Sequence, residues 1–367
     1  MPSTNQTILA ATAAFEKWLA GQLPIVKEDL LLKHQSMAED AFPFFRATFY
    51  RWLQLWPEIC PGLAKAPRLL AIGDLHIENF GTWRDLEGRL IWGVNDLDEV
   101  FPCSYAIDLV RLTASAYLAI LAEHLDVSRR EASEAIEEGY RDAIAAGGKA
   151  FILAEDHQWL RLMALSKLRD PVHFWDKLTH LPPFTAKPPQ EVRDLLEESL
   201  PPKSRYQLKR RIAGLGSLGH PRILAVSCDS GAFLAREAKA IRPSAWVWAK
   251  GETKQLLYGP QLAACAKRIP DPFVRFHTRW LVRRLAPDCS RIELASLAAE
   301  RDEARLLYSM GWETANMHFG SPAAIPQVKR DLAQRKSRWL HKAAKAMSKA
   351  TLQDWQVWRK SWKKLSK

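Results

Sequence analysis

The pattern of apolar and polar residues predicts helices at both ends of the chain and strands in two regions between them. Over residues 5–66, apolar residues recur at helical spacing and prolines interrupt the pattern. Residues 105–122 are apolar on nearly every side, which predicts a buried helix. Residues 128–145 open with the capping pattern of Ser128 and Glu131, which predicts a surface helix. Helices are therefore expected to dominate the first half of the chain.

The first β region is residues 68–99, where two apolar runs each end in acidic and amide residues. The run Leu69–Ile72 is followed by Gly73-Asp74-Leu75-His76, and Asn79 comes shortly after. A predicted hairpin leads into Leu90–Val94, which is followed by Asn95-Asp96-Leu97-Asp98-Glu99. Carboxylates and carboxamides at strand ends suit a divalent cation and a proton acceptor better than they suit a core. We therefore expect a functional site at these strand ends.

The second β region follows a proline-rich interval, residues 181–203, which is predicted to be a linker or a run of short turns. Residues 209–246 contain short apolar runs and a predicted third strand at Phe233–Ile241. Helix is expected over 253–268, strand over 273–285, and a long helix over 293–319.

A glycine cluster lies at the start of this region. Gly214, Gly216 and Gly219 form the pattern GxGxxG, with Ser217 inside it. A Rossmann fingerprint leads from a strand into a helix, whereas a strand is expected after these glycines. A loop that covers phosphates between two strands is therefore the better interpretation, and a simple tight turn is the alternative.

The length and composition of the chain limit the class of protein. With 367 residues the chain is long enough for two domains, and 47% hydrophobic and 26% charged residues are ordinary for a globular protein. The five cysteines are scattered singly, so neither a disulfide framework nor a zinc site is expected, and a reducing cytoplasm is the expected location. No apolar run approaches the ~18 residues that span a bilayer, so no transmembrane segment is expected.

The net charge of +12 is concentrated at the C-terminus. Residues 329–367 hold 13 Lys and Arg against two Asp, so the rest of the chain is nearly neutral. A basic helix with four tryptophans is predicted over 326–367. Cations interleaved with aromatic rings suit nucleic acid or an anionic membrane surface. Alternatively, the helix is amphipathic and its tryptophans pack on the body of the protein.

The spacing of the acidic residues matches the parts that phosphoryl transfer needs. A carboxylate accepts the hydroxyl proton, an amide and a carboxylate hold metal ions, and a flexible loop and a cation contact the phosphates. Asp74 and Asn79 have the D-x-x-x-x-N spacing of a kinase catalytic loop. Asp74 is then the expected base. Asn79 and Asp96 are the expected metal ligands, and Asp98 is the candidate for a further carboxylate ligand. The expected cofactors are ATP and Mg²⁺.

Four further residues have both a structural and a functional interpretation. His76 is a candidate catalytic residue, either as a general base or as a hydrogen-bond partner that orients the catalytic loop, and Asp108 is expected to brace the same loop. Asp108 and Arg111, near the start of the predicted buried helix, form either a structural pair or part of the site. Arg46, in the aromatic segment Phe42-Pro43-Phe44-Phe45-Arg46, either belongs to a helix start in the core or reaches an anion in the site.

These motifs resemble known families. GDLHIENFG resembles the catalytic loop of aminoglycoside phosphotransferases and choline kinases. Together with PFFR at 43–46, NDLDE, the helix with Asp108 and Arg111, and GLGSLG, it resembles more closely the bacterial family known as domain of unknown function 2252. The resemblance covers most of residues 30–320 and implies a kinase-like fold, but no settled substrate.

The order of the parts implies a circular permutation, because the glycine-rich loop follows the catalytic loop by about 140 residues. In the phosphotransferases a helix ending in Leu-His precedes the catalytic loop, and His318 ends the corresponding helix here. The related sequences favour Lys-Glu-Ala on the third strand, where this chain has Arg236-Glu237-Ala238 followed by Lys239. Because side chains alternate along a strand, only one of Arg236 and Lys239 is expected to face the nucleotide. Glu252 is the expected ion-pair partner.

The sequence therefore predicts an α+β protein with a permuted, kinase-like two-lobe fold and extra terminal helices. Its expected function is ATP- and Mg²⁺-dependent phosphate transfer to an unknown small-molecule or protein hydroxyl. The alternatives are a weak or inactive nucleotide-binding protein whose tail binds nucleic acid or membrane, and a metal phosphohydrolase. The expected parts are an N-terminal helical segment, a catalytic region, a β-rich nucleotide-binding region, a helix returning to the catalytic region and a basic tail (1–66, 67–203, 204–290, 291–320 and 321–367).

Overall fold

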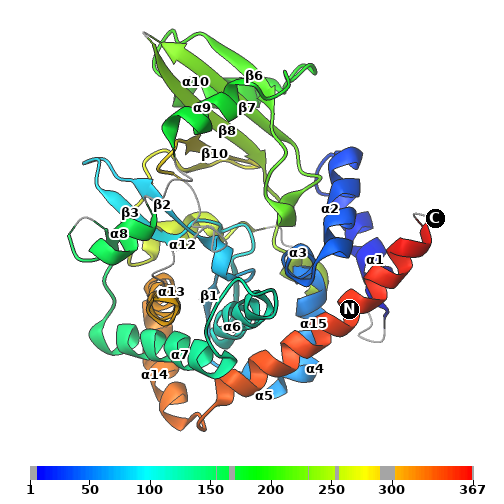
Figure 1. The fold of residues 1–367 in the computed structure, drawn as a ribbon, viewed down its shortest axis with the longest axis vertical. Coiled ribbons are helices and arrows are strands. Elements are labelled where there is room, and N and C mark those ends of the chain that lie inside the picture. The colour runs from blue at the N-terminus through cyan, green and yellow to red at the C-terminus, as the bar shows by residue number, and fades with distance from the viewer. Residues whose placement is uncertain are drawn as a thin grey trace.

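The structure is a computed structural model that describes residues 6–153, 155–164, 170–229, 231–252, 256–289 and 302–365. A five-stranded sheet stands at one end of the molecule, and a body of helices with two small sheets forms the remainder (Figure 1). All strand pairs are antiparallel. The predicted mixture of helices and strands is confirmed.

The N-terminal segment is helical, as its periodicity predicts. Its helices contribute the aromatic side chains of Phe15, Phe45, Trp52 and Trp56 to the main hydrophobic core. Asp40 caps the third of them by accepting a hydrogen bond from the Phe42 amide at 2.7 Å. The helices are α1 (Ile8–Ala20), α2 (Lys27–Glu39), α3 (Ala41–Ala47), α4 (Phe49–Ile59) and α5 (Pro61–Ala64).

The two apolar runs of residues 68–99 form strands that belong to different sheets. Strand β1 (Arg68–Ala71) pairs with β4 (Phe101–Ser104). Strands β2 (Phe80–Arg84) and β3 (Leu90–Val94) form the predicted hairpin, and β5 (Phe151–Ile152) pairs with β3. The strands β1 and β3 do not pair, yet the polar residues that follow them line the same cleft.

Helices α6 (Ala106–Leu121), α7 (Arg129–Ala146) and α13 (Glu303–His318) form the centre of the body (Figure 1). The predicted capping box at the start of α7 is present. Gly139 of α7 and Gly311 of α13 each lie so close to the other helix that a Cβ atom would collide with its backbone. This close packing fixes α13, which ends at His318. Residues 290–301, at the start of the predicted long helix, lie outside the described residues.

The β-rich region forms the five-stranded sheet. Its strands, in spatial order, are β6 (Tyr206–Arg210), β7 (Arg222–Asp229), β8 (Ala232–Ala240), β10 (Trp280–Leu285) and β9 (Arg275–Phe276). The GxGxxG segment connects β6 to β7 and contains the short 3-10 helix η3 (Leu215–Ser217). The predicted third strand and the strand–loop–strand arrangement are both confirmed.

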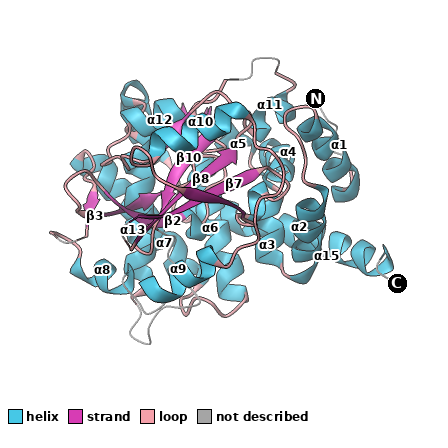
Figure 2. Cartoon of the chain, turned by 90° about the horizontal axis from the view of Figure 1, so that it is seen from above, coloured by secondary structure: helices cyan, strands magenta, loops and turns pink. Residues whose placement is uncertain are grey.

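One helix covers each face of this sheet, as the view in Figure 2 shows from above. Helix α10 (Gln190–Ser199) packs Val192 and Leu196 against Ala238 and Ala240, and α9 (Pro171–Thr179) packs Leu178 against the opposite face. The prediction of a linker or short turns at 181–203 is wrong for its second half. Pro189 precedes the first turn of α10, where proline is tolerated, so the prolines mark a helix start.

Shorter helices complete the body. The predicted helix over 253–268 is shorter in the structure, which places helices at 245–250 and 259–265 and does not describe 253–255. The remaining elements are α8 (Gln158–Ala164), α11 (Ala245–Lys250), α12 (Gly259–Cys265) and the 3-10 helices η1 (Ile77–Asn79) and η5 (Pro322–Ala324).

The C-terminal tail forms two helices instead of the single helix predicted. Helix α14 (Ile325–Gln334) ends before Arg338, whose φ of +61° cannot continue an α-helix, and α15 (Trp339–Leu365) follows. Helix α15 lies along the helical body (Figure 1). Among the helices that the structure describes, none has the length and apolar character needed to cross a membrane.

Candidate active site

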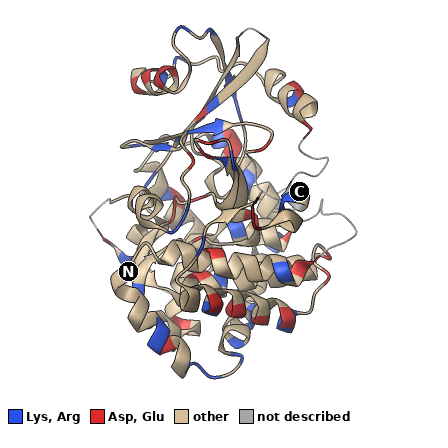
Figure 3. Ribbon diagram, turned by 90° about the vertical axis from the view of Figure 1, so that its left-hand side faces the viewer, with Lys and Arg blue, Asp and Glu red and all other residues tan. Residues whose placement is uncertain are grey.

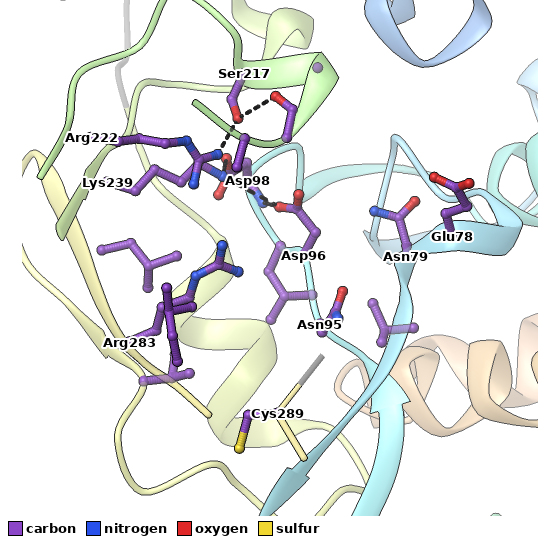
Figure 4. A pocket seen from close by; sticks show the side chains of 18 of the residues that line it. Glu78, Asn79, Asn95, Asp96, Asp98, Ser217, Arg222, Lys239, Arg283 and Cys289 are labelled. Atoms are coloured by element: carbon purple, nitrogen blue, oxygen red, sulfur yellow. Dashed lines mark hydrogen bonds and ion pairs between the residues drawn. The ribbon is translucent and has the colours of Figure 1, made fainter. Parts of the chain in front are cut away.

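A cleft of about 1280 Å³ lies between the five-stranded sheet and the helical body. Both β regions of the sequence line it, and Figure 4 shows that acidic and amide side chains occupy one side and basic side chains the other. The predicted site residues that line this cleft are Asp74, His76, Asn79, Asp96, Asp98, Gly214, Gly216, Ser217, Lys239 and Arg46.

The turn after β1 is held by a buried carboxylate. Gly73 has a φ of +88°, and a Cβ atom there would collide with the backbone of Glu99. Asp108, at the start of α6, accepts hydrogen bonds from the amides of Ile72 at 2.7 Å and Gly73 at 2.8 Å. Asp108 is fully buried, so these two bonds satisfy groups that have no access to water. The structure thus places Asp108 as the brace of the loop.

His318 completes this brace. Its Nε2 lies 2.9 Å from Asp108 Oδ2, and its Nδ1 lies 2.8 Å from the hydroxyl of Tyr140. In a neutral imidazole one nitrogen donates and the other accepts, and in that form Nε2 donates to the carboxylate of Asp108 while Nδ1 accepts from the tyrosine. The residue at the end of α13 is therefore linked through Asp108 to the turn that follows β1.

Asp74 lies at the base of the cleft beside Arg111. The Nε of Arg111 donates to Asp74 Oδ1 at 2.7 Å, and its Nη2 contacts the same oxygen. Arg111 is fully buried, with its guanidinium 4.0 Å from the centre of the Phe45 ring. Burial raises the pKa of Asp74 to about 7, although the neighbouring Arg111 acts in the opposite direction. Asp74 can therefore lose and gain a proton near neutral pH.

His76 and Asn79 shape the loop that follows Asp74. His76 Nδ1 accepts from the Glu78 amide at 3.2 Å, and Asn79 Oδ1 accepts from the His76 amide at 2.9 Å. These bonds form a capping box around η1. His76 is therefore placed as a residue that orients the loop. Asn79 Oδ1 retains a second lone pair for a ligand in the cleft.

Arg46 does not point at a free position in the cleft. Its Nη1 donates to Glu78 Oε2 at 2.5 Å, so a carboxylate of the loop after β1 already neutralises it.

Glu99, the last of the acids that follow β3, has a structural role. It accepts from Ser244 Oγ and the Ala245 amide, each at 2.7 Å, and caps α11.

The glycine-rich loop lies directly against Asp74. A Cβ atom on Gly216 would lie 3.8 Å from Asp74 Oδ2 and 3.3 Å from the Arg46 carbonyl oxygen. Gly214 and Gly219 have φ angles of +74° and +95°, which favour glycine. The loop is held from the N-terminal helices as well, because the Val26 amide donates to the Gly219 carbonyl at 2.9 Å.

Lys33 of α2 is a second contact to this loop. Its Nζ donates to the carbonyl oxygen of Gly216 at 3.2 Å. Burial lowers the pKa of Lys33 to about 8, although neighbouring acids oppose the shift. Sequence analysis did not identify Lys33, because its contact comes from a helix more than 180 residues away in the chain.

Lys239 reaches the acids at the end of β3. Its Nζ forms an ion pair with Asp98 Oδ2 and lies 3.8 Å from Asp96 Oδ1. Although burial acts in the opposite direction, the neighbouring Lys239 and Arg283 lower the pKa of Asp96. Figure 4 shows Asp96 between Lys239 and Asn79, which face it from opposite sides of the cleft. Folding therefore joins the two β regions at one place.

Arg236 and Glu252, two other predicted site residues, lie away from this meeting point. Arg236 points to the opposite face of β8, as strand alternation requires, and its Nε donates to the Ser199 carbonyl at 2.8 Å. Glu252 is exposed after α11 and does not line the cleft. The expected pairing of Glu252 with a cation on β8 is thus wrong, because Asp98 is already the partner of Lys239.

The oxygen atoms of Asn79, Asp96 and Asp98 are the candidate metal ligands. Asp98 Oδ1 is buried and has no hydrogen-bond partner among the described residues, so it fits a role as a cation ligand. Two carboxylates and a carboxamide are donors that Mg²⁺ accepts. In the part of the chain that the structure describes, no group of three His, Cys, Asp or Glu side chains is arranged to hold a metal ion.

Sequence analysis also missed the arginines on the inner face of the sheet. Arg211, Arg222 and Arg283 surround the fully buried Glu237 and line the cleft. Figure 3 shows basic positions on the strands of the sheet as well as on the helices. Strand alternation could have indicated part of this arrangement, because it places Glu237 on the same face of β8 as Lys239. It could not indicate which arginines from other strands meet Glu237.

The tryptophans of the C-terminal tail pack on the body. Trp339 Nε1 donates to Glu137 Oε1 at 2.9 Å, and Trp358 Nε1 donates to the His34 carbonyl at 3.2 Å. Trp355 and Trp362 pack against the apolar cluster that contains Phe44. The interpretation of α15 as an amphipathic helix docked on the body is confirmed. Its solvent side still carries lysines, among them Lys342, Lys345 and Lys349.

Comparison with known proteins adds one match. The family model described as "Uncharacterized protein conserved in bacteria (DUF2252)" matches residues 25–171. This range contains Asp74, Asn79 and Asp96. It ends before the glycine-rich loop and before the three arginines that surround Glu237. The match supports the resemblance to this bacterial family and names no activity. No curated protein and no solved structure matches the chain.

Proposed function

We propose that this protein is an ATP- and Mg²⁺-dependent phosphotransferase that acts on the hydroxyl group of a small molecule or a protein. One observation carries the proposal: a single cleft holds a buried acid with a pKa near neutrality, three oxygen ligands, a glycine-rich loop and a lysine. These are the parts that phosphoryl transfer requires.

Asp74 is the proposed general base. Arg111 holds Oδ1, so Oδ2, beside the glycine-rich loop, is the oxygen that accepts the proton. In the reaction, the acceptor hydroxyl loses its proton to Oδ2 while its oxygen bonds to the γ-phosphorus of ATP. The bond from that phosphorus to the bridging oxygen breaks, and ADP leaves with the electron pair. A base with a pKa near the working pH suits this step.

The opposite side of the cleft is proposed to hold the nucleotide. Asn79, Asp96 and Asp98 would hold Mg²⁺, which when bound offsets the charge on the phosphate oxygens. Lys239 is already within ion-pair distance of both acids. It would therefore contact phosphates and metal ligands from one position.

The arrangement of the chain is consistent with a permuted kinase-like fold, which we include in the proposal. The β6–β7 connection corresponds to the phosphate-covering loop, and β8 carries the lysine. The helix that ends in His318 follows these strands in the sequence and contacts the catalytic loop through Asp108. The helical body would be the catalytic lobe and the five-stranded sheet the nucleotide lobe.

The alternatives are less well supported. Binding of nucleic acid by the tail was proposed partly on its tryptophans, yet Trp339 and Trp358 are buried against the body. A two-metal phosphohydrolase needs clustered ligands, and the described residues include no such cluster of His, Cys, Asp and Glu.

The proposal is tested by titration calorimetry of ATP with and without Mg²⁺. The wild type is expected to bind Mg·ATP, and Asp96→Ala is expected to weaken this binding by about tenfold or more, which corresponds to only ~1.4 kcal/mol. The control is Asp194→Ala, on the exposed side of α10. The proposal fails if the wild type does not bind Mg·ATP, or if Asp96→Ala binds it as tightly.

A further inference from the structure

The inner face of the five-stranded sheet carries three arginines around one carboxylate. Glu237, at the centre of β8, is fully buried. Arg222 Nη1 donates to Glu237 Oε1 at 2.8 Å, and Arg283 Nη2 lies 2.7 Å from the same oxygen. Arg211 forms an ion pair with the other oxygen, Oε2. The three arginines come from β7, from β10 and from the segment directly after β6, so residues distant in sequence meet at Glu237.

The positive charge of this cluster exceeds its negative charge. With its nearest neighbours the cluster holds four cations, which are the three arginines and Lys239, against three carboxylates, which are Glu237, Asp96 and Asp98. The Arg222 side chain is about 4% exposed. An excess of buried positive charge is costly unless an anion compensates it. The cluster therefore favours an anionic ligand on its open side.

The open side of the cluster is the cleft. The side chains of Arg211 and Arg283 remain 25% and 29% exposed, and all three arginines line the cleft. Figure 4 shows Arg283 extending from its strand toward the space beside Asp96. Two of the three cations can thus reach a ligand without leaving Glu237.

Arg222 also connects the cluster to the glycine-rich loop. Its Nη2 donates to Ser217 Oγ at 2.6 Å, and Ser217 Oγ donates to the Gly214 carbonyl at 3.2 Å. The buried Nε of Arg222 has no hydrogen-bond partner among the described residues. A donor left without a partner in a buried position is a second sign that an acceptor binds here.

We propose that Arg211, Arg222 and Arg283 form a phosphate-binding subsite, positioned by Glu237, that takes the non-transferred phosphates of a nucleoside triphosphate. The identity of the ligand as a nucleotide rests on the proposed function, whereas the binding of a phosphate chain does not. Guanidinium groups suit this role because their donors match phosphate oxygens in pairs. Glu237 orients the arginines and limits the charge repulsion among them.

The test uses sodium tripolyphosphate and ATP, each without Mg²⁺, and adenosine, in titration calorimetry with the full chain. The wild type is expected to bind tripolyphosphate. Arg283→Gln is expected to weaken that binding by about 10- to 100-fold, as the loss of hydrogen bonds to a charged group does. Arg211→Gln, which lies in the segment after β6 and outside the strands, is a second variant in case Arg283→Gln does not fold. The control is Arg275→Gln, on the exposed side of the neighbouring strand β9.

The outcomes separate the two proposals. Binding of ATP more tightly than tripolyphosphate, with the same losses in both arginine variants, supports a nucleotide, and adenosine binding should be unchanged by them. Absence of tripolyphosphate binding, or equal binding by the wild type and both variants, overturns the subsite and leaves the cluster as a structural network. Because tripolyphosphate binding does not depend on Asp74, a protein that binds it but transfers no phosphate retains the subsite and loses the proposed function.

Discussion

The acidic and basic sides of the cleft are held in place in different ways. On the acidic side, one buried carboxylate, Asp108, binds backbone amides at Ile72 and Gly73 and so fixes the chain itself. On the basic side, one buried carboxylate, Glu237, binds the side chains of three arginines. The same type of residue therefore fixes a backbone in one place and a set of long side chains in the other.

The two sides of the cleft also differ in how freely they can move. A backbone with two buried hydrogen bonds and a tightly packed Gly73 has little freedom. The glycine-rich loop is held by the ends of two long side chains, those of Lys33 and Arg222, and by a single backbone hydrogen bond from the Val26 amide at its far end. We therefore infer that the acidic side is the fixed part of the site and the basic side the adjustable one. Substitutions on the two sides should affect different properties.

The largest effect on stability is expected from Asp108→Asn. The amide would bring a donor to a position where two backbone amides and His318 need acceptors. Loss of a partner in a buried charged network costs about 3–5 kcal/mol. Urea denaturation of the purified variant should therefore show a decrease in the free energy of unfolding of this size.

The matched control is Asp142→Asn, on the exposed side of α7, where the carboxylate bonds only to the Tyr308 hydroxyl among its described hydrogen bonds. Its expected effect is within about 0.5 kcal/mol. Equal stability of Asp108→Asn and Asp142→Asn would show that the acidic side is not fixed by Asp108.

A smaller effect is expected from pH. Burial raises the pKa of Asp74 to about 7, and only the ionised form can accept the hydroxyl proton. Below this pH the rate of phosphate transfer should fall about tenfold for each unit, and above it the rate should level off. Initial rates of ADP formation between pH 5.5 and 8 measure this profile. A rate that is flat down to pH 5.5 would exclude Asp74 as a base of this pKa.

Local sequence patterns predicted much of the acidic side. Residues 68–99 contain both strands, the turn at Gly73 and the acids in one short stretch, so alternation and turn chemistry were sufficient. The resemblance to phosphotransferases singled out His318 as the end of its helix, but its contact with Asp108, 210 positions away, was not predicted.

The basic side was harder to predict. Arg211, Arg222 and Arg283 meet only because β6, β7, β8 and β10 are neighbours in the sheet, and strand order is not visible in a single sequence. Glu252 was expected to pair with a cation by analogy of position, whereas Lys239 is paired with Asp98. The helix at 190–199 was missed because prolines on both sides of it outweighed its apolar spacing.

The central claim is that Asp74 accepts a proton in phosphate transfer from Mg·ATP bound in this cleft. The most direct measurement compares Asp74→Asn with the wild type in both ADP formation and Mg·ATP binding. The account predicts a rate lower by about 100- to 10,000-fold, the range for loss of a general base, with the dissociation constant of Mg·ATP nearly unchanged. An Asp74→Asn variant that forms ADP at the wild-type rate would contradict the account.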